Sequence, residues 1–122
     1  MSGDPYGARV RALFAALEHA GELDEATVVE VEEQGIRLRL EARLDGDMIE
    51  ALRFRAYGCP HVLAAAEALC AGHEGRPAAD LLEFRASDLM QSLSVPVEKT
   101  GRILVLEDAV RSLGQAIRDG SA

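Results

Sequence analysis

The segment that decides the fold is residues 48–72, MIEALRFRAYGCPHVLAAAEALCAG, in which a strand pattern gives way to a helix pattern. Up to position 57, apolar and charged residues alternate. The residues in phase on one face of this strand are Leu52, Phe54 and Ala56. From Pro60 onward nearly every residue is small or apolar, and proline is favoured at the first position of a helix. We therefore expect a strand, a tight turn at Gly58, an N-cap at Cys59 and a largely buried helix.

Two further strand patterns precede this segment. Residues 26–32 are rich in valine, and residues 35–44 alternate strictly, which is typical of half-buried strands. The expected inward residues are Thr27, Val29, Val31, Ile36, Leu38, Leu40, Ala42 and Leu44. The expected outward residues are Arg37, Arg39, Glu41 and Arg43. With turns at 33–35 and 45–47, the pattern predicts a three-stranded antiparallel sheet with one wet face and one covered face.

Helical patterns account for the rest of the chain. Residues 4–22 are expected to form a helix that stops at Gly21. Pro77 would open a second short helix, and Ser87 or Asp88 would cap a third. Residues 102–119 would form the last helix. The apolar faces of the first and last helices are Val10, Leu13, Phe14 and Leu17, and Leu106, Ala109, Val110 and Leu113. The fold class is therefore α+β, with helices on one face of the sheet, in one domain spanning residues 1–122.

Composition excludes several classes of function. The chain has 122 residues, 48% hydrophobic and 28% charged, with a net charge of −8. The acidic charge argues against nucleic-acid binding, and no apolar segment is long enough to span a membrane. The first residues lack the pattern of a secretory signal, so a cytoplasmic location is expected. No nucleophile triad, phosphate loop or carboxylate pair stands out, so an enzyme is not expected.

The two cysteines differ in position along the same helix. Cys59, at the N-cap, would face unpaired backbone N–H groups and the positive end of the helix dipole, which favour a thiolate. The alternative is a small side chain that only caps the helix. Cys70 follows eleven residues later, about 16 Å away along the axis. This separation excludes a disulfide or a shared metal, and Cys70 is interpreted as a core residue.

The histidines allow only a weak metal pattern. His61 lies in the first helical turn, where its ring could reach a metal held by Cys59. Cys70 and His73 are three residues apart, but neither spacing matches a structural zinc pattern. His73 and His19 are each interpreted as residues near a helix C-terminus, where the dipole favours a cation.

From the first helix onward the chain resembles the U-type iron–sulfur cluster assembly scaffolds, the IscU and NifU N-terminal family. The resemblance rests on IEALRFRAYGCPHVLAAAEAL, GRPAADLLEF, SDLMQSLSVP and LEDAVRSLGQAI, and it runs without gaps from about position 33 to 117. It implies the fold derived above and a role in iron–sulfur cluster assembly. Members of the family hold a transient cluster, or zinc, on three cysteines and an aspartate.

Only the middle cysteine is present here, as Cys59. In the gapless alignment the first cysteine falls at Glu33, the aspartate at Gly35 and the third cysteine at Arg102. A standard three-cysteine cluster is therefore not expected. Glu33 and His61 could join Cys59 in a mixed site for zinc or iron. Alternatively, Arg102 would close the vacated pocket by pairing with Cys59 or Glu33.

The resemblance also implies partners. In many members a chaperone of the Hsp70 type binds a proline-rich segment, of which Pro96 and Lys99 keep their places here. A cysteine desulfurase would pass sulfur to the family thiol, a step that needs only one nucleophilic cysteine.

Three hypotheses follow. The chain is a divergent assembly protein that binds iron, zinc or a cluster weakly or accepts sulfur on Cys59; it is a metal-free interaction or regulatory module; or it is a single-thiol redox sensor. We favour iron–sulfur cluster assembly.

Overall fold

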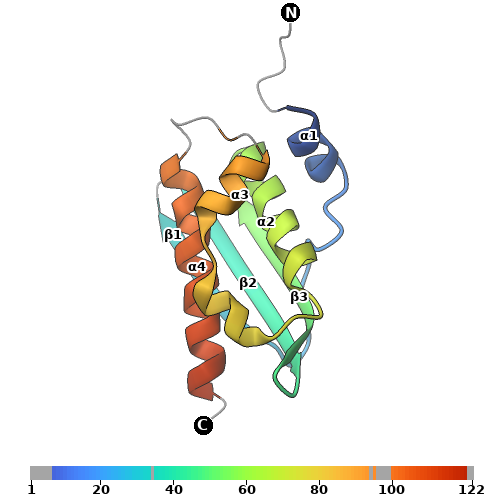
Figure 1. The fold of residues 1–122 in the computed structure, drawn as a ribbon, viewed down its shortest axis with the longest axis vertical. Helices are drawn as coiled ribbons and strands as arrows, with labels where there is room; N and C mark the ends of the chain where they lie inside the picture. The colour runs from blue at the N-terminus through green and yellow to red at the C-terminus, as the bar shows by residue number, and fades with distance from the viewer. Residues whose placement is uncertain (1–6, 34, 94, 96–99, 121–122) are drawn as a thin grey trace, which may run out of the picture.

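The computed structural model of the chain describes residues 7–33, 35–93, 95 and 100–120. Its three antiparallel strands lie in the order β1–β2–β3, and the helices cover one face of this sheet (Figure 1). In chain order the elements are α1 (Gly7–Ala15), β1 (Thr27–Glu33), β2 (Ile36–Asp45), β3 (Met48–Tyr57), α2 (Pro60–His73), the 3₁₀ helix η1 (Ala78–Glu83), α3 (Ala86–Leu93) and α4 (Thr100–Gly120). The predicted α+β class is confirmed.

The sheet follows the predicted alternation closely. Val29 pairs with Leu40 and Leu40 with Phe54, so apolar residues line up across the three strands. The buried residues of the covered face include Ile36, Leu38, Leu40, Ala42, Leu52 and Phe54. Between Arg43 and Leu44 the pairing of β2 with β3 shifts register, and it continues in the new register to the β2–β3 turn. Because side chains alternate between the faces, this register directs the apolar set toward the helices.

The outer face of the sheet differs from the prediction at Glu41. This residue was expected to be solvated, but it is only 1% exposed. Its carboxylate accepts a hydrogen bond from the backbone N–H of Leu23 at 2.9 Å and another from Nε of Arg39 at 2.9 Å. The segment between α1 and β1 therefore covers part of this face, and the buried carboxylate is satisfied by two donors.

The arginines of β2 and β3 are neutralised within the sheet region. Each of the five has a glutamate partner. The pairs are Arg37–Glu32, Arg39–Glu41, Arg43–Glu50, Arg53–Glu74 and Arg55–Glu22. These alternating arginines therefore give the outer face of the sheet a set of ion pairs with glutamates.

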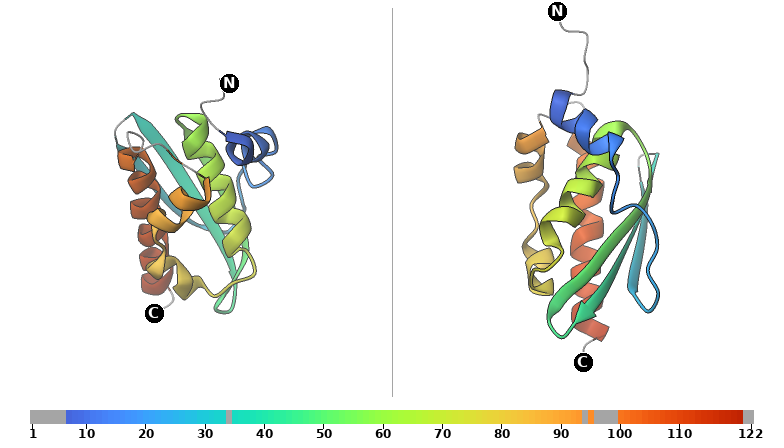
Figure 2. Two further views of the ribbon diagram at one scale, coloured as in Figure 1. Left: turned by 45° about the horizontal axis from the view of Figure 1, so that its top comes forward. Right: turned by 90° about the vertical axis from the view of Figure 1, so that its right-hand side faces the viewer.

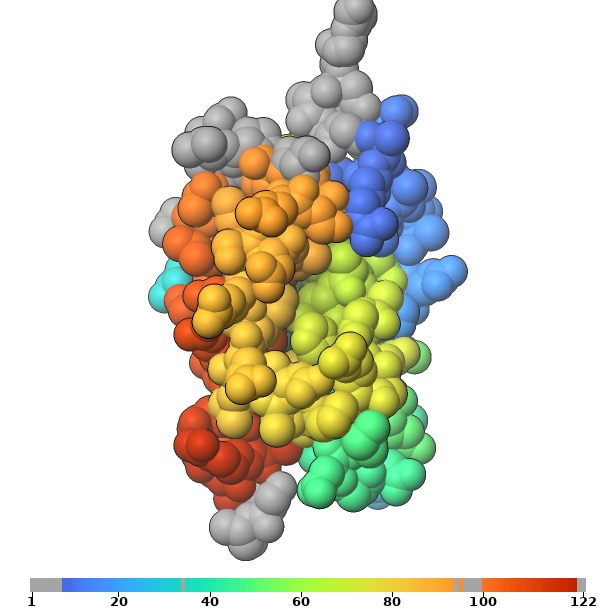
Figure 3. Space-filling model, viewed as in Figure 1, coloured from blue at the N-terminus to red at the C-terminus, as the bar shows by residue number. Residues whose placement is uncertain are grey.

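Helices α2 and α4 form the layer that covers the sheet (Figure 2). The face of α4 predicted to be apolar is buried, as are most residues of α2. Gly114 lets α4 approach η1 closely, because an added Cβ would lie 3.1 Å from side-chain atoms of Leu81 and Leu82. Seen from the helical side, the space-filling surface leaves little of the sheet visible (Figure 3).

The first helix is shorter than predicted. It ends at Ala15, and Phe14 is 44% exposed, so this residue does not belong to the buried face. The following residues leave the helix and pair with the outer edge of β3. Phe54 donates its N–H to the carbonyl of His19 at 3.0 Å, and Gly21 donates to the carbonyl of Phe54 at 2.9 Å. These bonds use edge groups of β3 that would otherwise be unpaired.

Two further helix starts were predicted wrongly. Pro77 is the N-cap of a 3₁₀ helix and not the first residue of an α-helix. Helix α3 begins at Ala86, so Ser87 and Asp88 lie inside its first turn and do not cap it. The backbone N–H of Ala86 instead donates to Oε1 of Glu107 at 2.8 Å. A carboxylate from α4 thus satisfies the start of α3, which local sequence could not indicate.

Candidate functional site

Cys59 is the N-cap of α2, as predicted, with Pro60 as the first helical residue. Its backbone is extended (φ −80°, ψ 165°), and its carbonyl accepts hydrogen bonds from the N–H groups of Val62 at 3.0 Å and Leu63 at 3.2 Å. The side chain is half-buried and makes no capping hydrogen bond to the helix. The thiol therefore does not act as a capping acceptor.

Gly58 is not required by the backbone of this turn. The glycines with positive φ in the described residues are elsewhere, and a Cβ added at Gly58 would lie 3.4 Å from Cβ of Val62, an ordinary contact. The chain does bend at Gly58, as predicted, but its φ is not in the left-handed region that favours glycine. The extended conformation of Cys59 and the fixed φ of Pro60 make the transition from strand to helix.

Cys70 is inaccessible to solvent, whereas Cys59 is partly exposed. Cys70 is fully buried in the core, as predicted, and neither Cys70 nor Cys59 forms a disulfide. Burial raises the pKa of the Cys70 thiol strongly, and the nearby carboxylates of Glu67 and Glu74 raise it further, while Arg53 lowers it. Only Cys59 of the two thiols can therefore react without opening of the fold.

The ligand positions implied by the resemblance gather at one end of the molecule. The turn between β1 and β2, the end of β3 and the starts of α2 and α4 all lie there (Figure 1). Glu33 is exposed, and Gly35 has a left-handed φ of +77° in the turn. Both line a hollow of about 540 Å³ together with Arg37 and Tyr57, which is 72% exposed.

The other predicted residues differ in their exposure or lie outside the described ranges. His61 is 2% exposed, within the buried face of α2, and Arg102 is partly exposed in the first turn of α4. Pro96 and Lys99 lie outside the described residues. Within the described ranges, no three His, Cys, Asp or Glu side chains lie close enough to hold a metal ion. A mixed site of Cys59, His61 and Glu33 stays a prediction.

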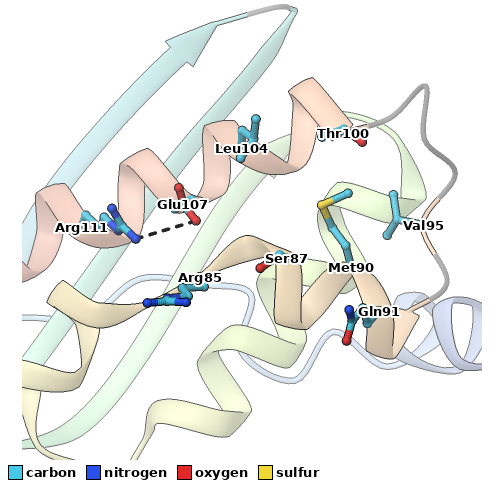
Figure 4. A pocket seen from close by; sticks show the side chains of 9 residues that line it. All are labelled: Arg85, Ser87, Met90, Gln91, Val95, Thr100, Leu104, Glu107 and Arg111. Carbon is cyan, nitrogen blue, oxygen red and sulfur yellow. Dashed lines mark ion pairs between the residues drawn. The ribbon is translucent and has the colours of Figure 1, made fainter.

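A groove of about 800 Å³ runs between α3 and α4, close to the start of α4 (Figure 4). Met90 and the 44%-exposed Leu104 are among its apolar lining residues. Arg85 and Arg111 lie toward one end, where Nε of Arg111 donates to the carbonyl of Phe84 at 3.1 Å.

A buried polar cluster at the other end of α2 was missed. His19 was expected near the end of its own helix, but α1 ends at Ala15, and the His19 ring lies between Glu67 and Glu74 of the α2 region, with its nitrogens 2.5 and 3.1 Å from their carboxylates. A signal was present in the sequence, because a lone glutamate among the alanines of a buried helix requires a partner. The identity of that partner, 48 residues away, had no local signal. His73, as expected, is the last residue of α2, and its Nδ1 lies 3.0 Å from the carbonyl of Leu69.

The helices that the structure describes include none long and apolar enough to cross a membrane.

Comparison with known proteins agrees with this fold. The chain is 25% identical over 75 residues to the iron sulfur cluster assembly protein 1 of Trachipleistophora hominis, covering 62% of this chain and 54% of that protein. It is 27% identical over 74 residues to the iron-sulfur cluster assembly protein IscU of Plasmodium falciparum (isolate 3D7), covering 61% of this chain and 46% of that protein. The matches thus span about half the length of these curated relatives.

The structural comparison covers more of the chain. The crystal structure of a nitrogen-fixing NifU-like protein (N-terminal) from Brucella abortus superposes with a TM-score of 0.73 at 17% sequence identity, covering 94% of this chain and 95% of the other. The family model of the NifU-like N-terminal domain matches residues 5–119. This chain therefore belongs to the NifU-like N-terminal domain family, the U-type scaffolds of iron–sulfur cluster assembly.

Proposed function

We propose that this chain acts in iron–sulfur cluster assembly as an acceptor of sulfur on Cys59, supplied by a cysteine desulfurase. The observation that carries the proposal is the contrast between its two thiols. Cys59 is half-buried at the N-terminus of α2 without a capping bond, whereas Cys70 is fully buried. A thiol at a helix N-terminus is favoured as thiolate, the nucleophilic form.

The transfer step needs one thiolate and no redox partner. The Cys59 thiolate attacks the outer sulfur of a persulfide on the desulfurase cysteine. A new bond forms between Sγ of Cys59 and that sulfur, and the old sulfur–sulfur bond breaks. The desulfurase cysteine leaves as a thiolate and takes up a proton, while the transferred sulfur keeps its oxidation state. The product is a persulfide on Cys59, which assembly would consume together with iron.

Holding a complete cluster is a poorer fit to the same residues. Clusters are bound mainly by thiolates, usually four. The sequence has two cysteines, one of them buried, and the position that the resemblance assigns to a third family cysteine is Arg102. A guanidinium at that position opposes a metal cation. In this proposal a cluster is built with help from ligands of a partner, or on another protein.

A second candidate is a mixed metal site. The half-buried Cys59 and the exposed Glu33 lie on elements that meet at one end of the molecule, and thiolate, imidazole and carboxylate are all ligands of zinc. His61 would have to turn outward to take part, because it is 2% exposed. This candidate requires a rearrangement that sulfur transfer does not.

The test combines a sulfur assay with a metal assay. Wild type, Cys59→Ser and Cys70→Ala are incubated without oxygen with a cysteine desulfurase and cysteine, and intact masses are recorded. Sulfur acceptance predicts the mass of one added sulfur atom in wild type and Cys70→Ala, removed by a thiol reductant and absent in Cys59→Ser. Failure of wild type to gain sulfur would contradict the proposal.

Iron, zinc and acid-labile sulfide are measured on the same anaerobic preparations. Cys59-dependent zinc alone would support the mixed site. Near-stoichiometric iron and sulfide in wild type would show that fewer thiolates than four hold a cluster. The metal-free module would be favoured if Cys59 gained no sulfur, if no metal were found, and if Cys59→Ser still bound its protein partner. A Cys59-dependent response to oxidant without any desulfurase dependence would favour the redox sensor.

A further inference from the structure

His19 lies where three parts of the chain meet. It follows α1, its carbonyl accepts a hydrogen bond from the N–H of Phe54 in β3 at 3.0 Å, and its ring faces α2. Its own N–H donates to Oε1 of Glu67 at 2.8 Å. The residue therefore fastens the N-terminal segment, residues 7–21, to both the sheet edge and the neighbouring helix.

The ring of His19 is placed between two carboxylates. Nδ1 lies 2.5 Å from Oε2 of Glu67, and Nε2 lies 3.1 Å from Oε1 of Glu74, the C-cap of α2. Ionised carboxylates only accept hydrogen bonds, so both ring nitrogens must carry a proton for both contacts to be favourable. The geometry is that of a charged imidazolium bridging two glutamates.

The two glutamates do not depend equally on this ring. Glu74 also accepts hydrogen bonds from the N–H of Leu52 at 2.8 Å and from the guanidinium of Arg53. The hydrogen bonds of Glu67 within the described part of the chain both come from His19, and its side chain is 4% exposed. The buried thiol of Cys70 also lies near these carboxylates, and it stays protonated because burial raises its pKa. Loss of the proton from His19 therefore weakens mainly the contact to Glu67.

The fastened segment covers apolar surface beside the start of α2. Val10 is fully buried, and Leu13 and Leu17 pack against the core. Helix α1 contacts α2 and lies beside the half that begins at Pro60 (Figures 1 and 2). Leu17 also lines a hollow together with Tyr57 and Leu63, one on each side of the Cys59 turn. Movement of this segment would change the surroundings of the thiol end of α2.

We propose that His19 is a pH-dependent latch, which holds residues 7–21 on α2 and β3 while its imidazole is protonated and loosens them when the proton is lost. The inference does not require sulfur transfer and stands independently of it. Release would expose the edge of β3 at Phe54 and the apolar surface under α1.

The direction of the pH dependence follows from the surroundings of the ring. Burial lowers the pKa of His19, but hydrogen bonds and charge from Glu67 and Glu74 outweigh it, so the pKa lies above the ordinary 6.5. The latch is then fully present below pH 6.5 and is lost as the pH rises through the raised pKa. The segment should be held most tightly in mildly acidic solution and less tightly in alkaline solution.

Hydrogen exchange of the full chain, read by NMR at several values from about pH 6 to about pH 9, tests the latch. Rates are divided by the intrinsic rate at each pH, which leaves the opening constant. In wild type, the opening constants of α1 amides should rise with pH, by roughly tenfold for each unit by which the His19 pKa is raised. In His19→Gln they should be high at every pH. His73→Gln is the matched control and should behave as wild type.

An NMR titration of the histidine rings gives a second measurement, and its wild-type part does not depend on a variant folding well. His19 should titrate above 6.5 in wild type, and its pKa should fall in Glu67→Gln. Opening constants of α1 that are independent of pH in wild type would overturn the latch. So would a pH-dependent rise that persists in His19→Gln, or a His19 pKa that is not raised.

Discussion

Helix α2 has a cysteine near each of its ends, and the surroundings of the two thiols differ. At the first end, Cys59 is half-buried, and its sulfur makes no capping hydrogen bond. At the far end, Cys70 is fully buried beside a network in which His19 bridges Glu67 and Glu74. The far end encloses polar groups that satisfy one another, whereas the first end leaves a thiol partly exposed. The residue type alone does not indicate this difference.

The largest expected difference between the two ends is in thiol reactivity. With iodoacetamide near neutral pH, we expect Cys59 to react at least about 100-fold faster than Cys70, because burial removes both access and thiolate from Cys70. Peptide mass spectrometry after timed quenching measures both rates. In urea the two rates should converge. Similar rates in the folded protein would mean that the far end of α2 opens readily. The two thiols would then not differ in accessibility.

Substitution at the far end should have the largest effect on stability. Cys70→Ser places a hydroxyl in a fully buried apolar position, at an expected cost of about 1–3 kcal/mol. Cys70→Ala removes only the sulfur and should cost less. Urea unfolding of both variants, followed by far-UV circular dichroism, gives the two free energies of unfolding. If serine were tolerated as well as alanine, the site would contain an unused hydrogen-bond partner.

How far the sequence predicted this molecule depends on the range of the interactions. The sheet register, the N-cap at Cys59 and the buried Cys70 follow from local alternation, from Pro60 and from helical phase. These patterns lie within a few residues of each other, so a single sequence contains them. The apolar faces of β2 and α4 were predictable for the same reason.

The parts that sequence did not predict involve partners far away in the chain. The early end of α1 depends on pairing with Phe54, and the cap of α3 is Glu107. The burial of Glu41 depends on Leu23, and that of Glu67 on His19. In each case a polar group is satisfied by a residue at least 18 positions away, which no periodicity indicates.

At the candidate site, the sequence located the thiol but not its neighbours. The positions of Glu33 and Arg102 came from a resemblance, which gives correspondence along the chain and not side-chain geometry. The exposed Tyr57 beside Glu33 and Gly35 was not singled out, although it lies only two residues before Cys59. Its exposure depends on how the end of β3 meets the turn before β2.

The third prediction concerns the contribution of Glu74 to stability. Burial alone would raise its pKa, but hydrogen bonds from Leu52, Arg53 and His19 lower the pKa below 4.5. The stabilisation is therefore present above pH 4.5 and is lost as the pH falls through the lowered value. Glu74→Gln should cost about 1 kcal/mol at neutral pH, and this difference from wild type should shrink in acid. Urea unfolding of both proteins at several pH values measures it; a difference independent of pH would contradict the ionised role.

The smallest effect is expected from Cys59→Ser on stability. Serine is a preferred N-cap because its oxygen accepts a hydrogen bond from the first helical turn, and the sulfur of Cys59 makes no such bond. The substitution should leave the free energy of unfolding unchanged or raise it, by up to about 1 kcal/mol. Urea unfolding beside Cys70→Ser measures it. A clear loss would show that the sulfur packs as a structural group and would remove the contrast between the ends of α2. A higher free energy of unfolding for Cys59→Ser would mean that cysteine stabilises this position less than serine does. That result is expected if the thiol at position 59 is kept for its chemistry and not for the stability of the fold.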